Sequence, residues 1–136
     1  MAFELTRQIE KHLVNDLIVW LTTVTPAGRP APRPVWFVWD GTDVIIYSQP
    51  DAAKLKHIAA DDHVSLHFNC TPAGGDVVVI SGRAVVIDDA PPPSAVPGIA
   101  DKYRVTIQAM GYDQEWYDSY SAAIRVAPER VWTIPE

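Results

Sequence analysis

The segment from Tyr47 to His57 combines residue types that can bind a phosphate group. Lys54, Lys56 and His57 follow closely after the hydroxyl group of Ser48, in a stretch that predicts the first turn of a short helix. Cations and the free backbone N–H groups of a helix N-terminus together suit a phosphate. Two lysines are equally typical of the solvated face of a surface helix, so the segment alone leaves both interpretations open.

A run of large apolar residues, Pro34-Val35-Trp36-Phe37-Val38-Trp39, is the second candidate, and Trp20 lies in the strand predicted before it. Such a run can present backbone N–H and C=O groups beside a flat hydrophobic wall, which a planar heterocycle needs. A strand that is buried on both faces would explain the same run.

The third candidate is Ser81-Gly82-Arg83-Ala84. Gly82 would allow a ligand or another backbone to approach closely, and Arg83 adds a positive charge. A bend in a barrel strand accounts for Gly82 equally well.

The common catalytic signatures are missing from the sequence, which contains no G-x-S-x-G elbow, P-loop or G-x-G-x-x-G motif. His63 and His67 have the sequence spacing of a metal pair, but on a strand they lie about 13 Å apart, too far to share one ion. Cys70 has no second ligand or base beside it in the sequence, so we expect a packed thiol. We therefore predict no catalytic side chain and no metal ion.

Composition limits the class of protein. The 136 residues suit a single domain over residues 1–136, with 48% hydrophobic and 21% charged residues. The net charge of -6 argues against nucleic-acid and membrane-surface binding. With one cysteine and neither a signal peptide nor a membrane span in the sequence, we expect a cytoplasmic protein.

The elements that position these residues are mostly strands. Apolar periodicity and turn residues predict strands over 17–24, 31–39, 43–48, 63–69, 77–87, 122–127 and 130–134. Helices are predicted over 4–14, after an Asp51 cap, over 99–110 and within 112–121. Pro32 and Pro34 must lie at a sheet edge or bulge, because proline donates no ladder hydrogen bond. The pattern predicts a mainly β fold, a closed or half-closed antiparallel barrel with a few short helices.

Four segments in this order resemble the pyridoxamine-phosphate-oxidase-like split β-barrel superfamily. They are Trp20–Pro30, like its opening hairpin; Pro34–Gly41, like its second strand; Lys54–Ile58 with Val64–Leu66, like its phosphate-contacting segment and next strand; and Ile80–Ala84, like a later strand. The resemblance covers residues 5–90 well and the C-terminal third loosely. The short length and the Pro34–Trp39 run are most similar to the actinobacterial branch that uses the deazaflavin coenzyme F420.

This resemblance implies an FMN-binding type of split barrel that forms a homodimer, with the cofactor in a groove between subunits. It also implies hydride transfer from reduced F420 to an activated small organic acceptor. By position, the resemblance places Lys54 and Lys56 at the cofactor phosphate or acidic tail with Ser48 nearby, and Val35, Trp36 and Phe37 along the ring system. His57 and Arg83 complete the predicted cofactor-binding set.

Two alternatives remain at this point. One is an FMN-binding oxidase of the same fold, and the other is a non-catalytic module that stores a cofactor or a tetrapyrrole. The C-terminal residues 130–136 only partly match the arginine-bearing substrate motif of pyridoxamine phosphate oxidases, which argues against vitamin B6 oxidation. The acidic tail of F420 needs a longer basic track than FMN does, and Arg29 and Arg33 could extend that track.

Overall fold

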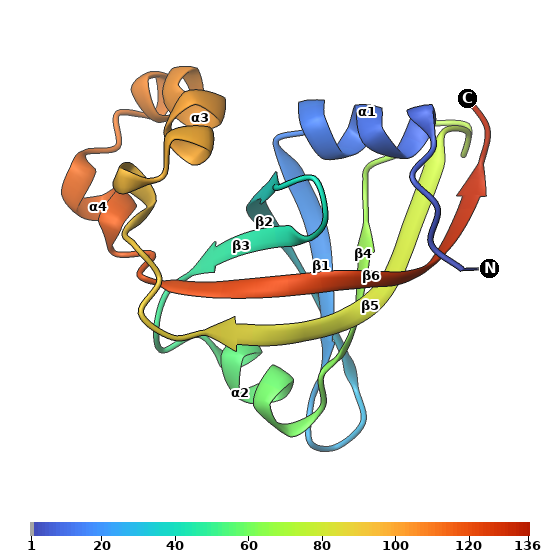
Figure 1. Cartoon of the computed structure of the whole chain (residues 1–136), viewed down its shortest axis with the longest axis horizontal. Helices are drawn as coiled ribbons and strands as arrows, with labels where there is room; N and C mark the ends of the chain where they lie inside the picture. The colour runs from blue at the N-terminus through green and yellow to red at the C-terminus, as the bar shows by residue number, and fades with distance from the viewer. Residues whose placement is uncertain (1) are drawn as a thin grey trace.

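The computed structural model describes residues 2–136, in which six antiparallel strands close into a barrel in the order β1-β2-β3-β6-β5-β4 (Figure 1). The strands are β1 (Ile18–Val24), β2 (Pro30–Trp39), β3 (Val44–Ser48), β4 (His63–His67), β5 (Val77–Ile87) and β6 (Ala122–Ile134). The helices are α1 (Arg7–Asn15), α2 (Ala53–Ala60), the 3-10 turn η1 (Pro93–Ala95), α3 (Pro97–Met110) and α4 (Gln114–Asp118). The predicted mainly β barrel with a few short helices is confirmed.

Alternating apolar residues build the barrel core, because successive side chains of a strand point to opposite faces. On β4, Val64 and Leu66 are buried, whereas the side chains on either side of them are at least partly exposed. On β1, Val19, Leu21 and Thr23 face the interior in the same way.

The first half of β2 is an open edge. Residues 30–36 pair with β1, but β3 pairs only with Phe37, Val38 and Trp39. Pro30, Pro32 and Pro34 all lie in the half of β2 that pairs with β1 alone. No strand of the described chain lies on the other side there, so the missing proline N–H costs no ladder hydrogen bond on that side. The predicted edge position of Pro32 and Pro34 is confirmed.

The C-terminal strand is longer than the sequence suggests. Residues 122–127 and 130–134 were predicted as two strands, but β6 runs through both and pairs along the whole of β5. The register shifts where Ser81 pairs with Arg130 and Gly82 with Pro128, so Glu129 is an extra residue. A β-bulge therefore accommodates the proline within one continuous strand.

The helices differ from their predictions mainly at their first residues. Thr6 caps α1 by accepting a hydrogen bond from the Ile9 N–H. The predicted Asp51 cap of α2 is wrong: the cap position is Ala52, which has no side-chain hydrogen bond. Gly111 ends α3 as predicted, in the left-handed conformation with φ 72°.

Residues 93–118 form a separate group of short helices at one side of the barrel, which we call the helical lobe (Figure 1). Its buried residues Ile99, Tyr103 and Tyr117 form a second hydrophobic cluster, against which Trp36 of β2 and Tyr47 of β3 pack. The lobe is thereby attached to the open edge of β2.

The structure also places the cysteine and excludes one class of helix. Cys70 is a free, exposed thiol that follows β4, so the expectation of a packed side chain is wrong.

Within residues 2–136, no helix is both long and apolar enough to cross a membrane.

Candidate functional site

A cavity of about 330 Å³ lies between the open edge of β2 and the helical lobe. β2 contributes Pro34, Val35, Trp36 and Phe37 to its wall, and α2 contributes Lys54. Its size is at the lower end of the range for small-molecule sites. The structure thus brings four residues of the predicted cofactor-binding set to one place.

Aromatic rings form most of the cavity wall. All five tyrosines of the chain line it: Tyr47, Tyr103, Tyr112, Tyr117 and Tyr120. Trp36 stacks on Tyr103 with ring centroids 4.3 Å apart, and Tyr112 stacks on Trp116 at 3.6 Å. Stacked rings offer broad, flat, apolar surfaces, which suit a planar heterocycle.

Tyr103 and Lys102 of α3 hold the end of β2 where β1 no longer accompanies it. The Tyr103 hydroxyl accepts a hydrogen bond from the Phe37 N–H at 2.8 Å and donates one to the Leu17 carbonyl at 2.6 Å. The Lys102 ammonium donates to the Phe37 carbonyl at 2.9 Å and lies 3.5 Å from the centroid of the Phe37 ring. The helix therefore satisfies backbone groups that a strand would otherwise pair.

Burial changes the acidity of both groups. It lowers the pKa of Lys102 to about 8, an effect that the nearby Asp16 carboxylate partly opposes. It raises the pKa of Tyr103 well above its ordinary value, so this hydroxyl keeps its proton and remains able to donate.

Two cations meet beside the cavity. Burial lowers the pKa of Lys54, and the positive charge of Arg33 lowers it further, so the two side chains are close enough to repel. Neither forms an ion pair with a carboxylate anywhere in residues 2–136. The Arg33 guanidinium instead donates to the carbonyl of neighbouring Pro32 at 2.8 Å. An anionic group bound here would relieve the repulsion between the two cations.

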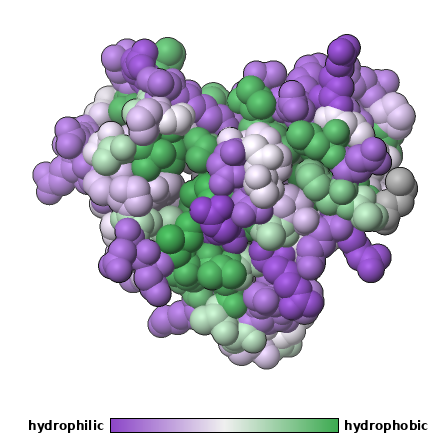
Figure 2. Space-filling model, in the orientation of Figure 1, coloured by the Kyte–Doolittle hydropathy of each residue, from purple (hydrophilic) through white to green (hydrophobic). Residues whose placement is uncertain are grey.

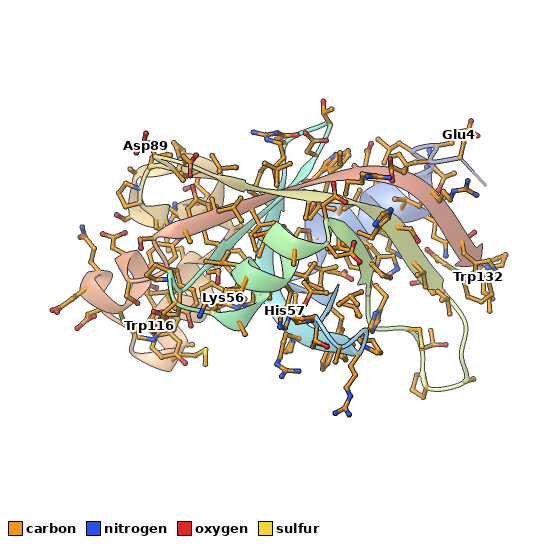
Figure 3. The ribbon with its side chains drawn as sticks, turned by 90° about the horizontal axis from the view of Figure 1, so that it is seen from below. Glu4, Lys56, His57, Asp89, Trp116 and Trp132 are labelled. Atoms are coloured by element: carbon orange, nitrogen blue, oxygen red, sulfur yellow. The ribbon has the colours of Figure 1, made fainter. Side chains whose placement is uncertain are left out.

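Three predicted residues lie near this region without lining the cavity. Ser48 is fully buried, and its hydroxyl donates to the Gln49 carbonyl at 3.0 Å. His57 shares a 2.8 Å hydrogen bond with the Thr23 hydroxyl, which joins α2 to β1. Lys56 is exposed and lies toward the end of the molecule that carries Trp116 (Figure 3). Their roles toward a cofactor stay predictions.

Arg83 lies elsewhere, in a second and more open groove of about 710 Å³. Its guanidinium is 3.3 Å from Asp62 and 3.6 Å from Glu129, so its charge is already neutralised. The structure therefore does not bring Arg83 together with Lys54.

Sequence reasoning missed the wall that the helical lobe contributes. Residues 112–120 contain four aromatic side chains, and that density was the available signal. Tyr117 is the most enclosed of the four, with 7% of its surface exposed, and its buried hydroxyl has no hydrogen-bond partner in the described chain.

Similar structures are found among proteins that bind different redox groups. An F420 reductase is 23% identical with a TM-score of 0.62, and the match covers 90% of this chain and 94% of that one. A FAD-binding protein from Mesorhizobium loti is 18% identical with a TM-score of 0.61, over 96% and 93%. HutZ, a heme storage protein from Vibrio cholerae, is 12% identical with a TM-score of 0.64, over 97% and 96%. At these identities the likeness concerns the fold.

The family is established by sequence. No curated protein has significant similarity to the chain. Residues 5–135, however, match the sequence profile described as pyridoxamine 5'-phosphate oxidase. That match spans nearly the whole chain, including the helical lobe and β6. The chain therefore belongs to the pyridoxamine 5'-phosphate oxidase family and has its split-barrel fold.

Proposed function

We propose that this protein is an F420-dependent reductase, which transfers a hydride from the reduced deazaflavin to an unsaturated or otherwise activated small organic molecule. The observation that carries the proposal is the cavity, in which an aromatic wall adjoins the unpaired cations Lys54 and Arg33. A planar ring with an anionic tail is the ligand class that fits both features.

The residues of the chain would bind, orient and enclose such a ligand. Val35, Trp36 and Phe37 would lie along the ring, and the hydrogen bonds from α3 keep this part of β2 in place. Trp116 and the tyrosines of the lobe would exclude water, which protects a hydride transfer from competing reactions. When bound, the reduced cofactor supplies the hydride, so the protein itself needs no nucleophile.

For a tetrapyrrole, the described lining holds no histidine or cysteine as an axial iron ligand, and Met110 and the tyrosines are the residues there that could ligate iron. Charge decides between the two flavin-like candidates, F420 and FMN. F420 carries carboxylates beyond its phosphate, and Arg29 and Lys56 are exposed cations available to a longer acidic tail.

Titration with oxidised F420 and, separately, with FMN tests the cofactor. We expect F420 to bind at least about tenfold more tightly, a difference of about 1.4 kcal/mol. The advantage should shrink as salt rises, because exposed charge pairs are screened. Equal affinities at low salt would contradict the F420 assignment and favour the FMN-binding oxidase.

Replacing Lys54 tests the anion subsite. Lys54→Ala should weaken F420 binding by about 1–3 kcal/mol, the range for a lost hydrogen bond to a charged group. Lys11→Ala is the matched control. Lys11 lies on α1, and its replacement removes the same charge from an exposed ion pair with Glu136. An affinity that Lys54→Ala leaves unchanged at low salt would assign Lys54 to a solvated helix face.

A further inference from the structure

Prolines occupy alternate positions along the first half of β2, at residues 30, 32 and 34. They pair with Val24, Thr22 and Trp20 of β1. In an antiparallel pair of strands, positions that exchange two backbone hydrogen bonds alternate with positions that exchange none. Proline has no N–H group and cannot exchange two. The three proline positions are therefore those that exchange none, and the residues between them carry the hydrogen bonds to β1.

The carbonyl groups of these prolines consequently point away from β1, toward the open edge. Phe37 has the opposite parity, and its N–H and C=O groups lie on the β1 side, where the Tyr103 hydroxyl joins Phe37 to Leu17. This alternation is what the register of β1 and β2 requires. β3 begins to pair with β2 only at Phe37, so within residues 2–136 no strand covers the carbonyls of Pro32 and Pro34.

The cavity beside the helical lobe runs along this edge. Successive side chains of a strand point to opposite faces, so a cavity over one face of β2 would be lined by alternate residues. Four consecutive residues, 34–37, line this cavity instead, although Val35 and Phe37 pack in the barrel core and Pro34 is exposed. Tyr47 of β3 also lines it, which places the cavity on the side of β2 that faces away from β1. A ligand in the cavity therefore lies on the side toward which the Pro34 carbonyl points.

The edge beside the cavity offers a hydrogen-bond acceptor followed by a donor. The Pro32 carbonyl accepts a hydrogen bond from the Arg33 guanidinium at 2.8 Å, but no side chain in residues 2–136 donates to the Pro34 carbonyl. Trp36 carries the next N–H group on this side, because its pair on β1 has the same parity as the proline pairs and it has no partner in register on β3. A C=O group followed by an N–H group matches a ligand in which an N–H lies beside a C=O, as one strand matches the edge of another.

We propose that the backbone of Pro34 and Trp36 is the specificity-determining edge of the cavity, which selects a planar ring that carries an N–H beside a C=O, such as the imide edge of a deazaflavin or flavin. This rests on the proposed function and deepens it. The Pro34 carbonyl accepts from the ring N–H, and the Trp36 N–H donates to the neighbouring ring carbonyl. The Trp36 side chain, stacked on Tyr103, supplies a flat wall beside the same edge. Lys54 and Arg33 bind the anionic tail, so different groups recognise the ring and the tail.

The backbone carbonyl itself is the first readout. In a triple-resonance NMR experiment on labelled native protein, the N–H of Val35 reports the ¹³C shift of the Pro34 carbonyl. The N–H of Ala31 reports that of Pro30, which does not line the cavity and serves as the internal control. When F420 is added, we expect the Pro34 carbonyl signal to move downfield, as a new hydrogen bond to a carbonyl requires. The Pro30 signal should stay in place.

The ligand supplies the second readout. FMN and 3-methyl-FMN carry the same phosphate tail, and the second replaces only the ring N–H with an N-methyl group. We expect 3-methyl-FMN to bind at least about fivefold more weakly, because the Pro34 carbonyl loses its donor. Lys54→Ala should weaken both ligands equally and leave the ratio of their affinities unchanged, since Lys54 acts on the tail that both share. The ratio should likewise resist added salt, which screens only the charged contacts.

The outcomes separate this proposal from the proposed function. If F420 or FMN binds but the Pro34 carbonyl signal stays in place, or if 3-methyl-FMN binds as well as FMN, the recognition edge is overturned and the proposed function stands. A ratio that Lys54→Ala changes would also contradict separate recognition of ring and tail. If F420 binds and FMN does not, the carbonyl signal with F420 decides. If neither binds the native protein, the proposed function fails and the recognition edge with it.

Discussion

At the scale of single residues, a close approach of β5 and β6 depends on one glycine. A Cβ atom on Gly82 would lie 2.3 Å from the Ala127 carbonyl oxygen, beside the bulge that connects β5 and β6. No flexible side chain is available to move aside, so backbone would have to shift. The requirement for glycine here is steric, because β5 and β6 approach each other closely at the bulge.

Gly82→Ala should therefore lower the free energy of unfolding by about 1–3 kcal/mol, as overpacked sites do. Gly98→Ala is the control: it lies in the first turn of α3 with no atom within 4 Å of the added methyl group. The unfolding free energy of that variant should rise by about 0.4–1 kcal/mol, because alanine lowers the conformational entropy of the unfolded chain. Urea unfolding of the two variants measures both changes, and equal stabilities would contradict the steric argument.

At the scale of elements, α3 is held to the barrel by very few polar contacts. Tyr103 can donate only one proton, which goes to Leu17, so the Phe37 carbonyl depends on Lys102. Tyr103→Phe would leave the buried Phe37 N–H without its acceptor. Because the same strand lines the cavity, this contact links the position of α3 to the geometry of the site.

We expect Tyr103→Phe to cost about 1–3 kcal/mol of unfolding free energy, the range for unsatisfied buried groups. Tyr112→Phe removes a hydroxyl that makes no hydrogen bond within residues 2–136, so it should change stability little. Thermal unfolding of both variants checks this. Similar melting temperatures would show that the stacking of Tyr103 on Trp36, and not its hydroxyl, holds α3.

The attachment of α1 depends on pH through His12. Burial alone lowers the pKa of His12, but its hydrogen bonds to Asp16 at 2.6 Å and Asp76 at 3.0 Å outweigh burial and raise it above 6.5. A raised pKa in the folded state contributes stability that is complete below pH 6.5 and is lost as pH rises through the folded value.

The unfolding free energy should therefore fall as the pH rises above 6.5 and through the raised folded pKa of His12, and His12→Gln should flatten that slope. The contribution of Lys102 to stability changes with pH in the opposite direction. Its pKa is lowered from 10.5 to about 8, so the unfolding free energy rises as the pH increases from about 8 to 10.5. Denaturant titrations at each pH measure the slope. A slope that His12→Gln leaves unchanged would contradict the role of His12.

At the scale of the whole molecule, large apolar side chains remain on the surface. Val85, Val105 and Trp132 are 61%, 76% and 60% exposed. Figure 2 shows apolar side chains gathered toward the middle of one face, with a mostly polar rim. In Figure 3, Trp132 lies at the opposite end from Trp116. An apolar patch such as the one in Figure 2 is typical of protein–protein interfaces.

We propose that the covering partner is a second copy of the chain, as the family resemblance implies. Light scattering at micromolar concentration should give the mass of a dimer, twice 15.0 kDa. Val85→Lys places a charge at an exposed apolar position of β5 and should shift the population toward monomer. A native protein that is monomeric at that concentration would contradict the proposal.

Much of the fold could be predicted because its signals are local. The strand predicted from the alternation in residues 63–69 and the edge position of Pro32 and Pro34 depend on local residue types, and both were confirmed. The division of β6 was wrong because Pro128 usually interrupts a strand. Here a bulge opposite Gly82 absorbs it, and that depends on a strand some 45 residues away.

The candidate cofactor site also has features that depend on local sequence and features that depend on tertiary contacts. The sequence by itself determined the run of residues along β2, the basic start of α2 and the family that both resemble. Only the tertiary structure decided which cations meet, because Arg33 and Lys54 are brought together by chain closure while Arg83 is paired with acids in another groove. Likewise, the aromatic residues 112–120 become a cavity wall only when the helical lobe packs on the open edge of β2. Local patterns carry periodicity and residue type, whereas a cavity consists of contacts between residues far apart in the chain.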